Sequence, residues 1–162
     1  MIKKVFIDWV NESYLKVNSK EFKDLKKWAY EYIDDNNGGF NSVKDARDYL
    51  DWFFDIYSKV KKEMVLYRII YLDKKSELDI KNIGLYFTDD SNNFDNNFIE
   101  NLGFTKSDIE SGKFYIIKIK IDRDGIDWEN TITTRLAHPN ENEFTLKKKS
   151  KYKVISIKKW KG

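Results

Sequence analysis

Residues 64–72 read MVLYRIIYL, a run in which aliphatic, aromatic and β-branched side chains greatly outnumber polar ones. This composition is typical of a β-strand. The residues before it carry apolar side chains at helical spacing, so the spacing of apolar residues changes from a helical to a strand pattern near residue 64. We therefore expect an α+β fold, in which N-terminal helices precede a mostly β half.

Two helices are predicted upstream of this strand. The first has a capping-box-like start, Asn18 followed by Glu21, and the second starts at Ser42 with Asp45 three residues later. Apolar residues of the second helix recur in steps of three and four as far as Val60. We interpret this stripe as core packing rather than as a seam for a partner protein, because nothing else nearby would cover it.

The remaining elements are predicted from the alternation of apolar and polar residues and from turn residues. Strands are expected at 82–90 (NIGLYFTDD), 113–122 (KFYIIKIKID), 130–136 (NTITTRL), 141–144 (ENEF) and 150–160 (SKYKVISIKKW). A short helix closed by a glycine is expected at 95–104 (DNNFIENLGF). We interpret the chain as one domain, with a helical part at 1–62 and a β core at 63–162.

Composition argues against several classes of site. The 162 residues include no Cys, which excludes disulfides and thiolate chemistry, and a single His, His138, which argues against a histidine metal centre. No apolar run has the length of a membrane span, and Asp8 and Glu12 interrupt the segment where a signal peptide would be apolar. We therefore expect a cytoplasmic protein with no metal and no membrane partner. The net charge of +3 permits a nucleic-acid partner without requiring one.

Three groups of polar residues break the apolar pattern. Arg68 shares its predicted strand face with apolar residues, so its guanidinium is paired, reaches a polar ligand or lies at a solvated strand edge. Thr88 ends an apolar strand, where a hydroxyl either forms a turn or fixes a neighbouring side chain. Glu141 and Glu143 are two residues apart, so on one strand they would point the same way and require a cation, a polar ligand or solvent.

The order of these residues resembles the arginine–serine–glutamate class of ADP-ribosyltransferases over residues 64–160. LYRIIYL (66–72) resembles the arginine strand of that family, and ENEFTLKKKSKYKVISI (141–157) resembles its Glu-x-Glu strand, basic turn and following strand. GLYFTDD (84–90) is similar to the middle motif in its phage and bacterial forms, where an aromatic-Thr-polar sequence replaces Ser-Thr-Ser. This replacement leaves the second hydroxyl of the motif without a counterpart in the sequence.

The resemblance implies two packed, mostly antiparallel sheets, with NAD as the substrate in a cleft between them. Arg68 would hold the pyrophosphate of NAD or the adjoining ribose. Glu143 would bind the 2′-hydroxyl of the nicotinamide ribose and stabilise the positive charge that grows as nicotinamide leaves, and Thr88 would keep Glu143 aimed. Tyr86 and Phe87 are the candidates for stacking on nicotinamide, with a core role expected for one of the two.

The resemblance also suggests how the acceptor is handled. Glu141 would orient or deprotonate the incoming nucleophile, as the first acid of the motif does in arginine-modifying relatives. TITTRLAHPN (131–140) occupies the place of the loop that bridges NAD and the target in the family, which makes Arg135 and His138 candidates for target recognition. The implied protein is a monomeric phage or bacterial mono-ADP-ribosyltransferase, acting in the (host) cytoplasm on a protein, with nucleic acid as a second target class.

Two other functions stay open from the sequence. A nucleic-acid-binding module is indicated by a lysine run interleaved with Tyr152 and Trp160, although a solvated face would carry similar charges. That run comprises Lys147, Lys148, Lys149, Lys151, Lys153, Lys158, Lys159 and Lys161. The altered middle motif is also compatible with a transferase-like protein that has lost catalysis and only binds partners. Arg68 and Glu143 argue against that loss.

Overall fold

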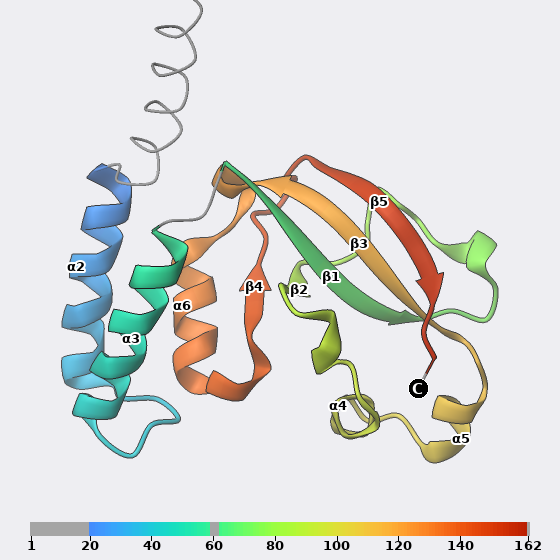
Figure 1. Cartoon of the computed structure of the whole chain (residues 1–162), viewed down its shortest axis with the longest axis horizontal. Coiled ribbons are helices and arrows are strands. Elements are labelled where there is room, and N and C mark those ends of the chain that lie inside the picture. The colour runs from blue at the N-terminus through green and yellow to red at the C-terminus, as the bar shows by residue number, and fades with distance from the viewer. Residues whose placement is uncertain (1–19, 59–61, 162) are drawn as a thin grey trace, which may run out of the picture. The chain divides into compact units, whose positions relative to one another are not determined.

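The chain begins with helices and continues mainly in strands, which confirms the α+β class (Figure 1). The computed structural model describes residues 20–58 and 62–161, so the helix start predicted at Asn18 lies outside the described residues. The chain divides into two compact units. The helical unit comprises Met1–Met64 with Trp128–Asn140, and the sheet unit comprises Val65–Asp127 with Glu141–Gly162. None of the described helices is both long and apolar enough to cross a membrane.

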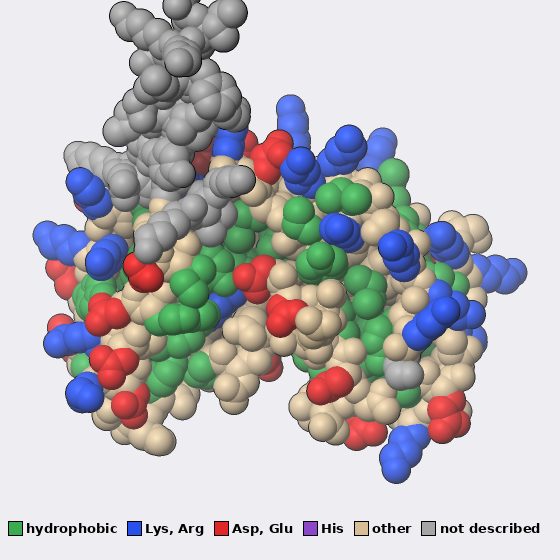
Figure 2. Space-filling model, in the orientation of Figure 1, with side chains coloured by type: hydrophobic (Ala, Val, Ile, Leu, Met, Phe, Trp, Pro, Cys, Tyr) green, Lys and Arg blue, Asp and Glu red, His purple; other side chains and the backbone are tan. Residues whose placement is uncertain are grey.

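The helical unit is built from α2 (Lys20–Asp35), α3 (Val43–Tyr57) and α6 (Trp128–Ala137). The Ser42 side chain accepts a hydrogen bond from the Asp45 backbone N–H at 3.1 Å, which confirms the predicted start of α3. Four residues of the predicted apolar stripe are buried together with Phe54: Ala46, Leu50, Phe53 and Tyr57. Val60, the last residue of the predicted stripe, lies outside the described residues. Charged side chains of both signs cover the exposed sides of α2 and α3 (Figure 2).

The strand predicted at 130–136 is wrong, because these residues belong to α6. The buried side chains of α6 follow helical spacing: Thr131, Ile132, Arg135 and Leu136. The threonines of this segment favour a strand by intrinsic propensity, but packing within the helical unit overrides that preference. Trp128 begins the helix and places its ring edge-on against Phe22 of α2 and Phe53 of α3.

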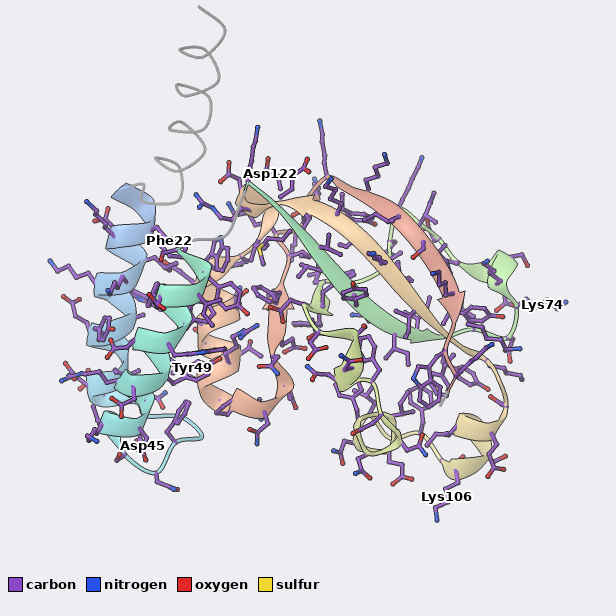
Figure 3. The ribbon with its side chains drawn as sticks, viewed as in Figure 1. Phe22, Asp45, Tyr49, Lys74, Lys106 and Asp122 are labelled. Carbon is purple, nitrogen blue, oxygen red and sulfur yellow. The ribbon has the colours of Figure 1, made fainter. Side chains whose placement is uncertain are left out.

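Arg135 is fully buried in the helical unit, with an exposed fraction of 0%. Its guanidinium donates hydrogen bonds to the Tyr49 hydroxyl at 3.3 Å and to the Tyr57 hydroxyl at 3.5 Å. The guanidinium carbon also lies 5.4 Å from the centre of the Phe53 ring, a cation–π contact. Figure 3 labels Tyr49, which projects from α3 on the side facing α6. Arg135 therefore has a packing role in place of the target-recognition role expected from the sequence, whereas His138 is exposed.

We expect Arg135→Ala to lower the free energy of unfolding by about 2–4 kcal/mol, because it leaves a cavity and removes the partner of two tyrosine hydroxyls. Arg47→Ala is the matched control. Arg47 is exposed and pairs with Asp34 at 3.4 Å, and loss of such a surface pair costs at most about 1 kcal/mol. Urea denaturation of both variants measures the difference, and equal midpoints would contradict a packing role for Arg135.

The sheet unit contains five strands in the order β4-β2-β1-β3-β5, in one antiparallel sheet. Their bounds are β1 Glu63–Tyr71, β2 Tyr86–Thr88, β3 Phe114–Asp122, β4 Glu143–Thr145 and β5 Tyr152–Lys159. The short helices α4 (Asn96–Asn101) and α5 (Lys106–Glu110) follow β2 in the chain. These strands and α4 confirm the predicted elements. Within the described residues the strands form a single sheet, so the expectation of two packed sheets is not confirmed.

The pairing of β1 with β2 is very short. β3 pairs with β5 along most of its length, with a register shift between Lys118 and Ile119. By contrast, β1 pairs with β2 at one register position, Tyr67 opposite Thr88. The β2–β4 pair is therefore joined to the wider β1–β3–β5 part of the sheet through a narrow connection.

Both faces of the sheet bury apolar side chains. Alternation along β3 buries Ile117, Ile119 and Ile121 on one face. A separate buried cluster joins strand ends to α4 and the C-terminal tryptophan: Ile69, Phe94, Ile99, Phe114 and Trp160. The Trp160 indole N–H donates to the Phe94 carbonyl at 2.9 Å, so its one polar group is satisfied within that cluster.

Candidate functional site

Strand register places four of the polar or aromatic side chains near the predicted motifs on one face of the sheet. Thr88 is directly opposite Glu143, and Tyr86 is directly opposite Thr145, in the β2–β4 ladder. Residues opposite each other on antiparallel strands share a face, with Cβ atoms about 4.5–5.5 Å apart. Tyr67 of β1 is opposite Thr88 on its other side and extends this face. We call this surface (Tyr67, Tyr86, Thr88, Glu143 and Thr145) the Thr88 face.

The hydroxyl of Thr88 is held by the turn that follows β2. Its oxygen accepts hydrogen bonds from the Asp90 backbone N–H and from the Asn93 side-chain amide, each at 3.3 Å. A hydroxyl oxygen has two acceptor positions and one proton to donate. Because both acceptor positions are occupied, the proton of Thr88 is available for a group on the Thr88 face, where Glu143 is the directly opposed acidic residue.

Asn93 was not predicted from the sequence, although its placement has a local cause. Residues Ser91–Asn93 form a 3-10 turn that Asp90 caps by accepting the Asn92 backbone N–H at 2.9 Å. This turn brings the Asn93 amide back to Thr88. The signal in the sequence was the Asp-Ser-Asn-Asn order directly after the strand, which is typical of such turns. The Asn93 amide is thus a second polar group held next to the Thr88 hydroxyl.

Arg68 lies one residue beyond Tyr67, so strand alternation directs its Cβ to the face opposite the Thr88 face. Its guanidinium reaches the beginning of β2, where it donates to the Tyr86 carbonyl at 2.9 Å. Within the described residues its buried Nε–H has no hydrogen-bond partner. Burial lowers the pKa of Arg68, and the negative charge of Glu143 acts in the opposite direction. The Glu143 carboxylate therefore interacts electrostatically with the Arg68 guanidinium, although the two residues belong to strands β4 and β1.

Gly84 makes room for that guanidinium. A Cβ at Gly84 would lie 2.7 Å from the guanidinium carbon of Arg68, which is closer than real Cβ contacts come. Gly84 also has a φ of +92°, in the left-handed region that favours glycine. Because Gly84 has no Cβ, the Arg68 guanidinium can lie against its backbone and donate to the Tyr86 carbonyl.

The two aromatic candidates differ in accessibility. Tyr86 has an exposed fraction of 53%, so its ring is open to a ligand on the Thr88 face. Phe87 has an exposed fraction of 2% and is directly opposite the buried Phe144 on the other face. Phe87 is therefore the member of the pair that packs in the core.

The prediction that Glu141 and Glu143 share a strand face is wrong. Glu141 ends a 3-10 turn, Pro139–Glu141, and β4 begins at Glu143. Asn142 between them has a φ of +49°, a left-handed conformation that interrupts strand alternation. Glu141 is exposed and precedes the strand, whereas Glu143 is half-buried within it.

The structure thus gathers Tyr86, Thr88 and Glu143 on one face, places Arg68 beside their strands and leaves Phe87 and Glu141 off that face. No group of three or more His, Asp or Glu side chains that could hold a metal occurs among the described residues. A hollow of about 430 Å³ in the sheet unit is lined by other residues: Phe94, Asp95, Asn96, Asn97, Trp160 and Lys161.

Comparison of the chain with protein-family models, with curated proteins and with solved structures gave no match in any of the three.

We expect Gly84→Ala to destabilise the protein by about 1 kcal/mol more than Gly103→Ala, because only the first displaces a neighbouring side chain. The two positions are matched in backbone strain: Gly103 has a φ of +94°, but a Cβ there would meet nothing within 4 Å. The excess should vanish when Arg68→Ala is added to both variants. Thermal and urea unfolding of the four proteins measure it, and an excess that survives Arg68→Ala would assign the cost to a different neighbour.

Proposed function

We propose that this chain is a mono-ADP-ribosyltransferase that cleaves the glycosidic bond of NAD and transfers ADP-ribose to a protein side chain. The observation that carries the proposal is the direct opposition of Thr88 and Glu143, with Arg68 on the neighbouring strand and electrically coupled to Glu143. The sequence motif had required an arginine, a hydroxyl and a glutamate on three different strands. Strands β1, β2 and β4 are adjacent in the sheet, which supports a common role for the three residues.

In this proposal Glu143 acts by electrostatic stabilisation. The bond between C1′ of the ribose and the nicotinamide nitrogen breaks, and its electron pair leaves with nicotinamide. The ribose then carries positive charge as an oxocarbenium ion, which a fixed carboxylate stabilises more than it stabilises neutral ribose. Thr88 contributes by holding that carboxylate, since its hydroxyl is left with a proton to donate.

Arg68 is proposed to bind the pyrophosphate of NAD. A guanidinium has five N–H donors in a planar fork that suits phosphate oxygens, and Arg68 uses one of them on the Tyr86 carbonyl. Its Nε–H lacks a partner within the described part of the chain, which favours a ligand that can accept it. The partial burial that lowers the pKa of Arg68 also strengthens its attraction for an anion.

Tyr86 and Glu141 complete the proposed site in different ways. The exposed ring of Tyr86 is the proposed surface for nicotinamide, since Phe87 is buried. Glu141 is proposed to take the proton of the incoming nucleophile as that nucleophile bonds to C1′, with a protein arginine as the acceptor. Its exposed position before β4 leaves it accessible to a macromolecular target. NAD is proposed to lie in a cleft that runs from the Thr88 face to the beginning of β2, where the Arg68 guanidinium lies.

Ligand binding to the folded state tests whether NAD is the substrate. NAD at millimolar concentration should raise the melting temperature by several degrees through mass action. Arg68→Ala should remove most of that shift, whereas Arg47→Ala, which removes an exposed arginine from the helical unit, should preserve it. A folded protein with no NAD response would contradict the proposal and favour a transferase-like protein without catalysis. A response that survives Arg68→Ala would retain NAD but assign its pyrophosphate to other residues.

The two glutamates should differ in what their substitution removes. Glu143→Gln should lower NAD turnover by at least about a hundredfold while the protein stays folded, because it removes the charge that stabilises the oxocarbenium ion. Glu141→Gln should impair transfer to arginine more than hydrolysis of NAD, since water needs less orientation than a guanidinium. Labelled NAD, with separate measurement of protein-bound label and free ADP-ribose, distinguishes these effects. Equal turnover by Glu143→Gln and the unmodified protein would refute the assignment.

A further inference from the structure

The outer part of the β3–β5 pair carries a cluster of lysines on one face. Lys120 of β3 is directly opposite Lys153 of β5, and Lys158 is opposite Ile116. Strand alternation places Lys118 on the same face as Lys120 and Ile116. We call these four residues the lysine face: Lys118, Lys120, Lys153 and Lys158. In Figure 2 the region over β3 and β5 shows several Lys or Arg side chains (blue) among hydrophobic ones (green).

This arrangement brings like charges together across the two strands. Like charges directly opposite each other on paired strands are destabilising, and Lys120 and Lys153 are such a pair. Among the described residues, Lys153 and Lys158 form no ion pair with a carboxylate. The acidic residue on the same row of β3 is Asp122, labelled in Figure 3 at the strand end. Its carboxylate accepts a hydrogen bond from the Asp124 backbone N–H at 3.0 Å, where it caps a turn.

The lysine face is continuous with the Thr88 face. The Lys118 ammonium lies 5.9 Å from the centre of the Tyr67 ring, which is directly opposite Thr88. Lys118 therefore lies on the same side of the sheet as Thr88 and Glu143. Positive charge extends from the middle of the sheet across β3 to its β5 edge, and residues 146–161 continue it with eight lysines and no acid.

We infer that the lysine face binds the sugar–phosphate backbone of nucleic acid and draws it across the Thr88 face. Lysines on one strand face are spaced about 7 Å apart along the strand, and those on adjacent strands about 5 Å apart. Such a row of compact cations matches a polymer with regularly repeated negative charges. Lysine binds phosphate as a point charge, so this surface contacts the backbone rather than reading bases. The exposed Ile155 of β5, with an exposed fraction of 45%, adds apolar area beside the row.

This inference does not depend on NAD chemistry, because it concerns equilibrium binding of a polyanion. A fluorescent single-stranded oligonucleotide of about 20 nucleotides should bind at low salt, without strong sequence preference. Its affinity should fall about tenfold or more between about 50 and 200 mM KCl, as expected for release of counterions from about three phosphates. Fluorescence anisotropy with DNA and RNA oligonucleotides measures both quantities.

A matched pair of triple variants locates the binding. Lys120→Gln/Lys153→Gln/Lys158→Gln should weaken oligonucleotide binding about tenfold or more, and the corresponding Lys→Arg triple should restore it. The control, Lys23→Gln/Lys27→Gln/Lys44→Gln, removes the same charge from exposed positions of the helical unit and should change affinity less than about threefold. If both Lys→Gln triple variants lost the same affinity for the oligonucleotide, the loss would reflect net charge alone and would overturn the inference. Absent binding, or equally tight binding of a polyglutamate peptide of similar charge, would also overturn the inference.

Discussion

The connection of β2 to β1 at Tyr67 opposite Thr88 is the constraint on which the candidate site depends. β2 and β4 are three residues long, and such short strands are not stable by themselves. Their position is maintained on the buried side by Phe87 opposite Phe144, both nearly inaccessible to solvent. A shift of β2 by one residue would turn Phe87 away from Phe144 and move Thr88 to the other face, so apolar packing on one face fixes the register of the polar residues on the other.

Backbone hydrogen bonds at the C-terminal end of β4 reinforce this register. The Asp127 backbone N–H donates to the Thr145 carbonyl, and the Leu146 N–H donates to the Leu85 carbonyl, each at 2.8 Å. Ile126 and Leu146 form an additional antiparallel bridge. Glu143 is therefore carried by a strand whose backbone is bonded to the segments before β2 and after β3. This support positions a carboxylate without requiring a long strand, which suits the electrostatic role proposed for Glu143.

The sequence predicted local features well where one interaction determined them. The Ser42 and Asp45 pair predicted the start of α3, and the alternation of apolar and polar residues predicted β3. Features determined by distant contacts were not predicted. Threonines suggested a strand in α6, where packing of Trp128 and Arg135 in the helical unit stabilises a helix. Likewise, Glu141 follows strand spacing in the sequence, but the left-handed conformation of Asn142 appears only in three dimensions.

The candidate site also combines features that are determined locally with features that depend on distant contacts. Opposition of Thr88 and Glu143 depends on the register between strands separated by more than fifty residues in the chain, which single-strand periodicity does not contain. The order of motifs nevertheless selected residues on three adjacent strands. The contribution of Gly84 could not be read from its motif, because it depends on where the Arg68 side chain lies.

The two arginines singled out by the sequence show how a structural role differs from a binding role. Arg135 is completely buried, and aromatic rings and tyrosine hydroxyls surround its guanidinium, so its burial is matched by local partners. Arg68 is only half-buried, donates to one carbonyl and retains a buried Nε–H without a partner in the described chain. A cation held by glycine and a backbone carbonyl, yet left with unused donors, is better explained by an anionic ligand than by packing. Its coupling to Glu143 links that ligand to the carboxylate on the other side of β2. The combination supports the proposal that the substrate is NAD, whose pyrophosphate would bind Arg68 and whose nicotinamide ribose would develop positive charge near Glu143.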